Sequence, residues 1–231
     1  MQKLSEYFEL TKPRLALMNV AVAAATFIFA SASPIDWPKL GGMVFGLFLV
    51  IGSACTFNNV ADRELDARMP RTKERAVAAG RIKPRDAYLF ASILLLCGLA
   101  VLFAIRWLAF CAALCGWAVY VLAYTPLKKK SGIALFVGAF AGATPSVIGY
   151  AAAPGALDLY AFALFAFLFL WQIPHFLAIA RYRYDDYTEG GVPLLVKRPS
   201  DEQARRRARK IFFYSLVVLV AFCVVLVIAH R

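Results

Sequence analysis

The sequence predicts an all-α fold, a polytopic membrane helix bundle of about seven transmembrane helices with its N-terminus in the cytoplasm. Hydrophobic residues make up 61% of the 231 residues, whereas soluble domains are about 45–50% apolar. The apolar residues form continuous runs, and about 17–25 residues are enough for a helix to cross the hydrocarbon core. These runs do not alternate at period two, which a membrane β-barrel requires.

The predicted spans follow one another along the chain, and turn-rich segments such as SASPIDWPK join them on one side. The other side carries two long charged loops, residues 58–86 and 179–209. No cleavable signal peptide is expected, because the first apolar run is long and no small-residue cleavage site follows it. We expect residues 1–231 to form a single transmembrane domain. Its spans lie at roughly 14–32, 39–57, 87–105, 107–124, 133–153, 157–178 and 210–229.

The charges predict the orientation. The net charge is +12, and 23 of the 26 Lys and Arg residues fall on the side that carries the N-terminus and the two long loops. This is the positive-inside pattern, which places these loops in the cytoplasm. We expect the chain to lie in the cell (plasma) membrane. The bases therefore need no nucleic acid to explain them. The orientation rule makes little use of Asp and Glu, yet 12 of 14 acids lie on the same side.

The first long loop opens with polar residues at helical spacing. Asn58, Asp62 and Asp66 follow one another every four residues, so a continuing helix would align them on one face. Carboxylate and amide oxygens suit magnesium, which typically binds one or two carboxylates together with substrate phosphates. The alternative is a solvated helix end with internal ion pairs. The bases that follow are suited to phosphate oxygens, namely Arg68, Arg71, Lys73 and Arg75.

The second long loop repeats this chemistry. Asp185 and Asp186 lie close to Arg183, and paired acids in both loops favour a diphosphate site over a simple orientation signal. His175 follows Pro174 in an apolar run, and polar groups at membrane depth usually face the bundle interior. His175 either contacts substrate or caps carbonyls freed by the proline.

Four further features have a structural or a functional explanation. Gln172 is costly in lipid, so we expect it to face inward. Tyr124 is a candidate to line the cavity. Lys128 to Lys130 are explained adequately by the orientation rule, and the five cysteines fit small apolar packing residues.

Several stretches carry a resemblance. NNVADRELDARMPRTKER resembles the Asn-x-x-x-Asp-x-x-x-Asp motif of the UbiA-type intramembrane prenyltransferases, and its continuation DARMPRT is similar to the haem O synthase branch. LTKPRLALMNV, YTPLKKKSGIALFVGAFAGATPSVIG and WQIPHFLAIARYRYDDYTEGGVPLL are similar to that branch too. The resemblance covers nearly the whole chain.

The resemblance implies a reaction. It implies transfer of a farnesyl group from farnesyl diphosphate to a vinyl group of haem B (protoheme IX), giving haem O. Asn58, Asp62 and Asp66 would act as the catalytic residues and, with Asp186, hold magnesium; Arg183 would join the diphosphate site. His175, Gln172 and Tyr124 would contact haem. A haem A synthase or a terminal oxidase in assembly would be the partner downstream.

The chain departs from the pattern of the branch at three points. Asp185 stands where the branch often has Lys, and Ala76 stands where a proline is common. The family has nine spans and seven are predicted here, so we expect this chain to lack the last two helices, which would help to close the bundle.

Three other functions are open on the residues. The chain would be a prenyltransferase for a quinone precursor or another aromatic acceptor, an anionic-ligand transporter or membrane binding protein, or a scaffold whose basic face binds anionic lipid. The transporter predicts uptake without turnover. The scaffold predicts that loss of Asp62 and Asp66 is harmless.

Overall fold

The computed structural model describes residues 2–154 and 157–230, and all regular secondary structure within them is helical. Within these described residues, seven segments are long and apolar enough to cross a membrane, which confirms the predicted number and order of spans. The elements are α1 (Gln2–Leu10), α2 (Pro13–Ala30), α3 (Trp37–Ala61), α4 (Arg63–Arg68), α5 (Pro84–Ile105), α6 (Trp107–Ala118), η1 (Val119–Tyr124), α7 (Thr125–Leu127), α8 (Ala134–Ala152), α9 (Leu159–Tyr182), α10 (Tyr184–Glu189) and α11 (Glu202–Ile228).

Two helices continue beyond the apolar runs that marked their predicted spans. Helix α3 runs to Ala61 rather than 57, and α11 begins at Glu202 rather than 210. At α11 the Asp201 side chain caps the helix by accepting a hydrogen bond from the backbone N–H of Ala204 at 2.7 Å. The residues that follow it are mostly good helix formers. Hydropathy therefore locates the membrane-embedded part of a helix rather than its end.

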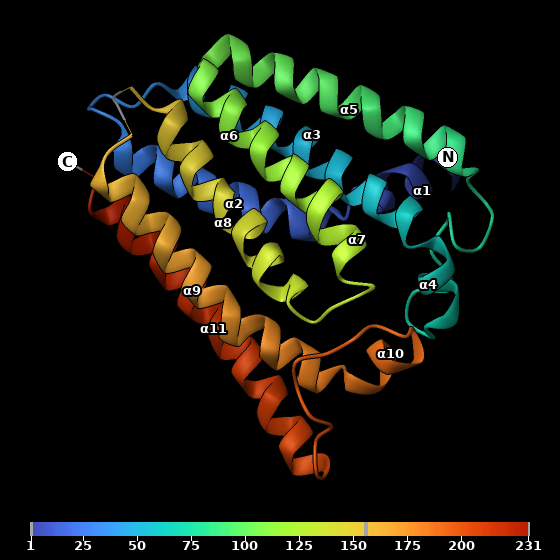
Figure 1. The fold of residues 1–231 in the computed structure, drawn as a ribbon. Coiled ribbons are helices and arrows are strands. Elements are labelled where there is room, and N and C mark those ends of the chain that lie inside the picture. The colour runs from blue at the N-terminus through green and yellow to red at the C-terminus, as the bar shows by residue number, and fades with distance from the viewer. Residues whose placement is uncertain (1, 155–156, 231) are drawn as a thin grey trace.

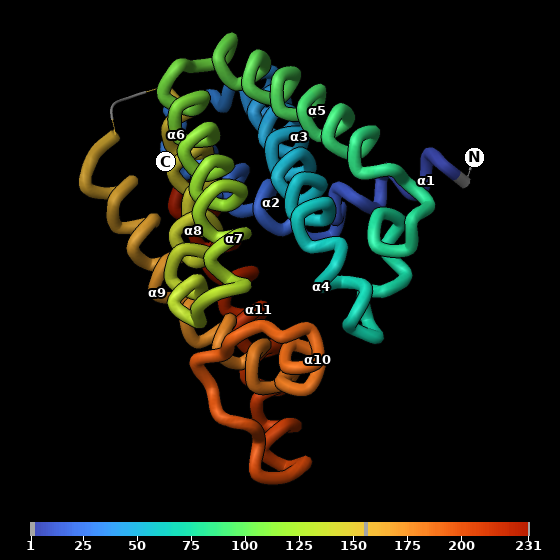
Figure 2. The backbone as a smooth tube through the Cα atoms, turned by 45° about the vertical axis from the view of Figure 1, so that its right-hand side comes forward, coloured from blue at the N-terminus to red at the C-terminus, as the bar shows by residue number. Residues whose placement is uncertain are grey.

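The two charged loops are accordingly shorter than predicted. Each contains a short helix of six residues, α4 in the first loop and α10 in the second. The irregular backbone is largely confined to residues 69–83 and 190–201. Figures 1 and 2 show α4 and α10 at the same end of the bundle. The charged loops thus gather over one end of the spans.

Small residues allow the helices to approach closely. Figure 1 shows α3 and α5 running side by side along one edge of the bundle. A Cβ at Gly98 on α5 would lie 2.7 Å from the carbonyl oxygen of Gly46 on α3, which only glycine avoids. Close backbone contact of this kind is typical of helix pairs in lipid.

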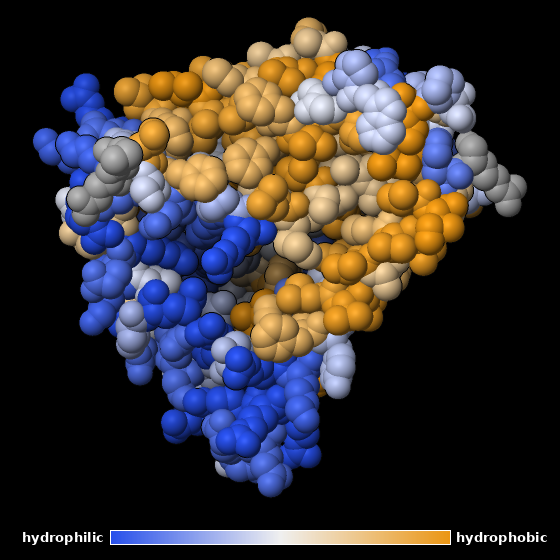
Figure 3. Space-filling model, turned by 180° about the vertical axis from the view of Figure 1, so that it is seen from behind, coloured by the Kyte–Doolittle hydropathy of each residue, from blue (hydrophilic) through white to orange (hydrophobic). Residues whose placement is uncertain are grey.

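The outer surface matches a multi-pass membrane protein. Large apolar side chains point outward along the spans; Leu159 is 78% exposed and Ile228 76%. Figure 3 shows hydrophobic residues over one part of the surface, hydrophilic residues over another, and a hollow at their boundary. Which membrane side the hydrophilic end faces stays a prediction.

Candidate active site

The first acidic motif lies at the end of α3. The helix is interrupted at Asp62, which joins α3 to α4 with φ −94° and ψ 2°. Hydrogen bonds nevertheless continue at helical spacing, from Asp62 N to Asn58 O at 2.9 Å and from Asp66 N to Asp62 O at 2.7 Å. All three side chains are buried, with about 2% of each residue exposed. The sequence folds this way because the four-residue spacing survives the break.

Each of these three polar side chains meets a base. Asn58 Oδ1 accepts a hydrogen bond from Lys12 Nζ at 3.1 Å. Asp62 Oδ2 is paired with Lys128, while Lys129 Nζ lies 3.7 Å from Asp62 Oδ1. Arg75 Nη1 lies 2.7 Å from Asp66 Oδ2. The structure therefore surrounds the motif with cations from three separate segments.

The second acidic motif is joined to the first loop. Asp186 Oδ2 lies 3.2 Å from Arg183 Nη1 and 3.7 Å from Arg71 Nε. Arg71 belongs to the first loop, so this contact links the two loops directly. Asp185 faces away from this contact, toward Arg198 (3.3 Å) and Arg205. Of the two neighbouring acids, Asp186 is the one that contacts the first loop.

Two of the bases predicted to bind phosphate pair with none of these acids. Arg68 and Lys73 are exposed and make no ion pair with the rest of residues 2–154 and 157–230. Lys12 and Lys128 were missed by sequence reasoning, because a base near a helix end satisfies the orientation rule. The signal available for Lys128 was Tyr124, one helical turn before it. Lys128 Nζ lies 5.3 Å from the centre of the Tyr124 ring.

Lys12 has an unusual backbone and an altered pKa. Its φ of 49° is in the left-handed region, uncommon for a side-chain-bearing residue and a form of strain that persists where the surroundings enforce it. Removal from water lowers the pKa of the Lys12 ammonium to about 8, and the Arg75 and Lys128 cations also lower it. Lys12 is therefore a cation that titrates near physiological pH.

The predicted metal ligands have suitable chemistry. Asp62 Oδ1 is buried and accepts no hydrogen bond from the described residues, so it has an oxygen left for a hard cation. Within residues 2–154 and 157–230, however, no three Asp, Glu, His or Cys side chains are grouped to hold an ion. Instead Asp62, Asp66 and Asp186 each face a base. Metal binding by these residues thus requires the bases to move aside.

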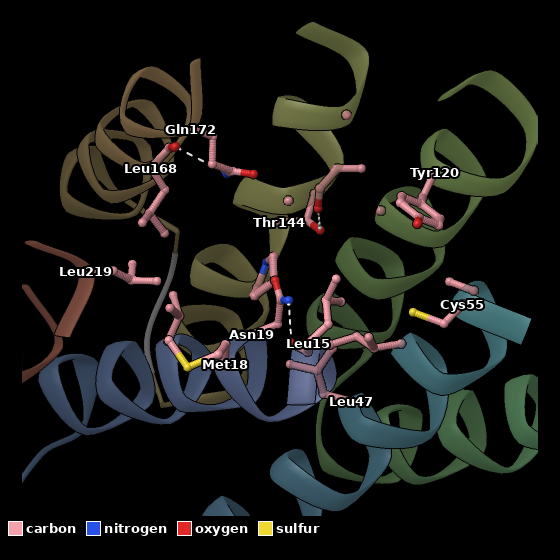
Figure 4. Close-up of a pocket in the computed structure, with 18 of the residues that line it drawn as sticks. Leu15, Met18, Asn19, Leu47, Cys55, Tyr120, Thr144, Leu168, Gln172 and Leu219 are labelled. Carbon is pink, nitrogen blue, oxygen red and sulfur yellow. Dashed lines mark hydrogen bonds between the residues drawn. The ribbon is translucent and has the colours of Figure 1, made fainter. Parts of the chain in front are cut away.

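An apolar cavity of about 480 Å³ lies among the spans. It is next to the charged cluster, which consists of Asn58, Asp62 and Asp66 with the bases Lys12, Lys128 and Arg75. The cavity is enclosed by α2, α3, α6, η1, α8, α9 and α11, and Figure 4 shows Cys55 and Tyr120 on one side and Gln172 and Leu219 on the other. Cys55 is three residues, about one helical turn, before Asn58 on α3, which places this part of the cavity beside the acidic motif. The cavity therefore adjoins the charged cluster.

Gln172 and His175 both line this cavity. Gln172 Nε2 donates to the carbonyls of Leu168 at 3.2 Å and Ala139 at 3.3 Å. Gly142 makes room for it, since a Cβ there would lie 2.0 Å from Gln172 Oε1. Tyr124 is not among the lining residues; it stacks on Tyr120, which is, with the ring centres 5.2 Å apart. Tyr124 supports the cavity wall from behind.

His175 is held by Ser215 of α11, a residue that sequence reasoning missed. His175 Nδ1 lies 2.7 Å from Ser215 Oγ, and that hydroxyl donates to the Phe212 carbonyl at 2.6 Å. Because the hydroxyl has one hydrogen, Nδ1 carries the hydrogen in the first bond and Nε2 of the neutral ring is unprotonated. No signal in the sequence pairs these helices. His175 bonds to Ser215 rather than to carbonyls near Pro174.

The same fold occurs in solved structures of intramembrane enzymes. A UbiA homologue from Archaeoglobus fulgidus bound to DMAPP and Mg²⁺ superposes with a TM-score of 0.73 at 19% identity, covering 96% of this chain and 76% of that one. A digeranylgeranylglyceryl phosphate synthase structure gives a TM-score of 0.72 at 20% identity, covering 98% and 86%. At these identities the likeness shows the fold alone.

A model of the UbiA prenyltransferase family matches residues 18–231, and the chain belongs to that family. It is similar to the protoheme IX farnesyltransferase of a Marinomonas species, with 39% identity over 202 residues that make up 87% of this chain and 68% of the relative. The protein of that name from Yersinia enterocolitica is 38% identical over 194 residues, 83% and 66% of the two chains. The resemblance drawn from the motifs is confirmed. The chain spans about two thirds of the length of these relatives.

Proposed function

We propose that this chain transfers the farnesyl group of farnesyl diphosphate to a vinyl group of haem B, giving haem O, with magnesium as cofactor. The observation that carries the proposal is the position of the charged cluster beside the apolar cavity. A prenyl diphosphate has a charged head and an apolar tail, and this arrangement offers a complementary surface to each. The relatives named protoheme IX farnesyltransferase support the choice of both substrates.

The bases of the cluster would bind the diphosphate. Lys12, Lys128 and Arg75 lie against Asn58, Asp62 and Asp66 from different segments, and Arg71 and Arg183 approach from the two loops. Cations fixed in this way stabilise the negative charge that grows on a departing diphosphate without reorganising during the reaction. Asn58, Asp62 and Asp66 would hold the bases, and magnesium when it is bound.

Magnesium, when bound to Asn58, Asp62, Asp66 and Asp186, would neutralise part of the diphosphate charge. The buried Asp62 Oδ1 without a hydrogen bond supports this assignment. The paired bases imply that Lys128 would turn from Asp62 to the diphosphate as the site fills. Breaking a buried ion pair is costly when either charge is left without a partner. The exchange is therefore favourable only when every charge finds a new partner.

The bond between the allylic carbon and the diphosphate oxygen breaks, and its electron pair leaves with the diphosphate. The terminal carbon of the vinyl group supplies the electron pair of the new carbon–carbon bond. Water adds to the resulting cation on the haem side and loses a proton, giving the hydroxyethylfarnesyl group. The apolar cavity would exclude bulk water from the allylic cation.

The test is to incubate membranes containing this chain with haem B, farnesyl diphosphate and magnesium, and to search the extracted haem for the farnesyl adduct by mass. We expect the adduct, and we expect Asp62→Ala to abolish it. A full-length relative assayed in parallel is the positive control. A folded sample that gives no adduct while the relative is active would refute the proposal for this chain.

Three further measurements separate the other candidates. Prenylation of an aromatic acid in place of haem B would indicate a quinone-precursor enzyme. Uptake of an anionic ligand into vesicles without any product would indicate a transporter. Binding to anionic vesicles that survives Asp62→Asn and Asp66→Asn would indicate a scaffold. Haem A synthase or a terminal oxidase in assembly remains the partner that the resemblance implies.

A further inference from the structure

Arg14 is the only Lys, Arg, Asp or Glu residue among the described residues that line the apolar cavity. It is exposed and makes no ion pair with any of residues 2–154 and 157–230. The charged side chains of the charged cluster, by contrast, are mostly paired with one another. An unpaired guanidinium at the edge of an apolar cavity has binding capacity for an anion that the protein itself does not use.

The position of Arg14 in its helix supports an anion at this point. Arg14 is the second residue of α2, where the helix dipole is positive, and the first turn contains no acidic residue. A cation at a helix N-terminus is disfavoured, whereas an anion there is favoured. The guanidinium and the helix end therefore both attract a negative group to the same place.

The strained backbone of Lys12 divides the two bases between two sites. Lys12 adopts a left-handed φ of 49° and sends its ammonium to Asn58 in the acidic cluster. Two residues later, Arg14 faces the cavity. The cluster already has Lys12, Lys128 and Arg75 beside its acids for a diphosphate. Arg14 therefore serves a different anion, one that belongs to a molecule in the cavity.

Arg14 marks the polar end of the cavity. On α2 the lining residues run from Arg14 through Leu15, Met18 and Asn19 to Val22, toward the bundle interior. Figure 4 shows Leu15, Met18 and Asn19 on this face, with Gln172 across the cavity. A ligand of matching shape has an apolar body and an acidic group at one edge. The cavity thus distinguishes the two ends of such a molecule.

We propose that Arg14 binds a carboxylate of the acceptor substrate and so fixes which edge of the acceptor enters the cavity first. The inference rests on the proposed function, under which the acceptor is haem B and the carboxylates are its propionates. With the propionates held at the polar end, the apolar edge of the ring, which bears the vinyl groups, points into the cavity. Arg14 is then a specificity-determining residue of the acceptor site.

The test compares haem B with its dimethyl ester, in which both carboxylates are masked. Binding is followed by the visible absorption of haem, with the full chain in detergent, without farnesyl diphosphate or added phospholipid. We expect esterification to weaken binding to the unmodified chain by about tenfold or more, the value of one charge-assisted hydrogen-bonded pair. In Arg14→Gln the two ligands should bind within about twofold of each other. Arg14→Lys should keep part of the difference.

Lys3→Gln is the matched control, since it removes an exposed charge near the N-terminus that does not line the cavity. It should discriminate between the ligands as the unmodified chain does. Equal binding of haem B and its ester to the unmodified chain, or undiminished discrimination in Arg14→Gln, would overturn the inference. The inference would also be overturned if Arg14→Gln reduced only the binding of phosphatidylglycerol. Arg14 would then be a lipid headgroup site.

The binding assay involves no turnover, so its outcome is separable from that of the proposed reaction. Carboxylate-dependent haem binding without farnesyl transfer would uphold the inference and refute the proposed function. Farnesyl transfer whose rate depends on neither Arg14 nor esterification would uphold the proposed function and refute the inference. Failure of haem B to bind at all would refute both.

Discussion

Arg75 holds Asp66 through a single guanidinium nitrogen, since Nη1 lies 2.9 Å from Oδ1 and 2.7 Å from Oδ2. The Asp66 side chain is 2% exposed and that of Arg75 28%. The pair connects Asp66 of α4 to the irregular segment that follows α4. It is thus a structural bond as well as part of the proposed diphosphate site.

Loss of Arg75 should destabilise the fold through the carboxylate left behind. Removing one partner of a buried pair costs about 3–5 kcal/mol, because a charge remains without compensation. We expect Arg75→Gln to lower the unfolding free energy by about 3 kcal/mol, and Asp66→Asn in the same chain to recover part of that loss. Arg68→Gln, an exposed base on the same loop, is the control. Thermal unfolding in detergent measures all three, and equal effects of Arg75→Gln and Arg68→Gln would contradict the argument.

Lys128 should matter for activity, whereas Lys130 should not. Both belong to the same run of three lysines, but Lys128 pairs with buried Asp62, while Lys130 is exposed and has no ion pair among the described residues. Under the proposed function, Lys128→Met removes a cation from the departing diphosphate, a change that costs about 10²-fold in rate. Farnesyl transfer by purified variants checks this. Similar activity of Lys128→Met and Lys130→Met would restrict the run to its role in orientation.

The pH dependence of diphosphate binding should report Lys12. Burial lowers the pKa of its ammonium to about 8 in the free protein, and a bound diphosphate would raise that pKa again. Between the two values, binding takes up a proton, so affinity is highest below pH 8 and falls as pH rises above it. We expect calorimetric titration with farnesyl diphosphate to show this fall, and Lys12→Arg to remove it, because arginine stays charged. An affinity independent of pH from 7 to about 9.5 would exclude Lys12 from the site.

Ser215 should act on haem binding through His175. Its hydroxyl fixes the hydrogen of His175 on Nδ1, so that Nε2 is the free nitrogen on a ring that faces the cavity. Ser215→Ala removes about 1 kcal/mol of hydrogen bonding from the fold, but it also frees the ring to exchange tautomers. We therefore expect weaker haem B binding and an altered absorption spectrum of the bound haem. Ser215→Thr keeps the hydroxyl and should restore both, whereas a spectrum unchanged in Ser215→Ala would show that the contact only supports packing.

The sequence was sufficient for the spans and for the acidic motif, since both follow from local patterns. Apolar runs locate membrane-embedded helices, and the spacing of Asn58, Asp62 and Asp66 is itself helical. The partners of these residues were not predictable in the same way. Lys12 reaches Asn58 across 46 positions and Lys128 reaches Asp62 across 66. Such contacts depend on how the helices pack, which hydropathy does not encode.

The start of α11 and the tautomer of His175 could not be predicted from the sequence, for related reasons. The cap at Asp201 extends α11 into a charged segment that hydropathy excludes from the span. The bond between His175 and Ser215 joins two helices 40 positions apart. Neither residue carries a local pattern that indicates the other. The departure at Asp185 was visible in the sequence, but its consequence depends on Arg198 and Arg205.

Asp185 should hold the second loop in place rather than bind diphosphate. Its carboxylate pairs with Arg198 at 3.3 Å and with Arg205 at the start of α11, so it fastens both ends of the stretch that follows α10. The groups are partly exposed, and each such pair contributes about 0–1 kcal/mol, too little to change global unfolding. Asp185→Lys replaces both attractions with repulsions, so we expect trypsin to cleave after Lys197 several-fold faster at unchanged unfolding temperature.

Glu189→Lys provides the matched control for Asp185→Lys. It makes the same charge change on the same short helix, at an exposed residue without an ion pair among the described residues. Because it breaks neither arginine contact, its cleavage rate should stay near that of the unmodified chain. Farnesyl diphosphate affinity should remain within about twofold in both variants, since Asp185 faces away from Asp186 and Arg71. Loss of that affinity in Asp185→Lys alone, with cleavage unchanged, would instead place Asp185 in the diphosphate site.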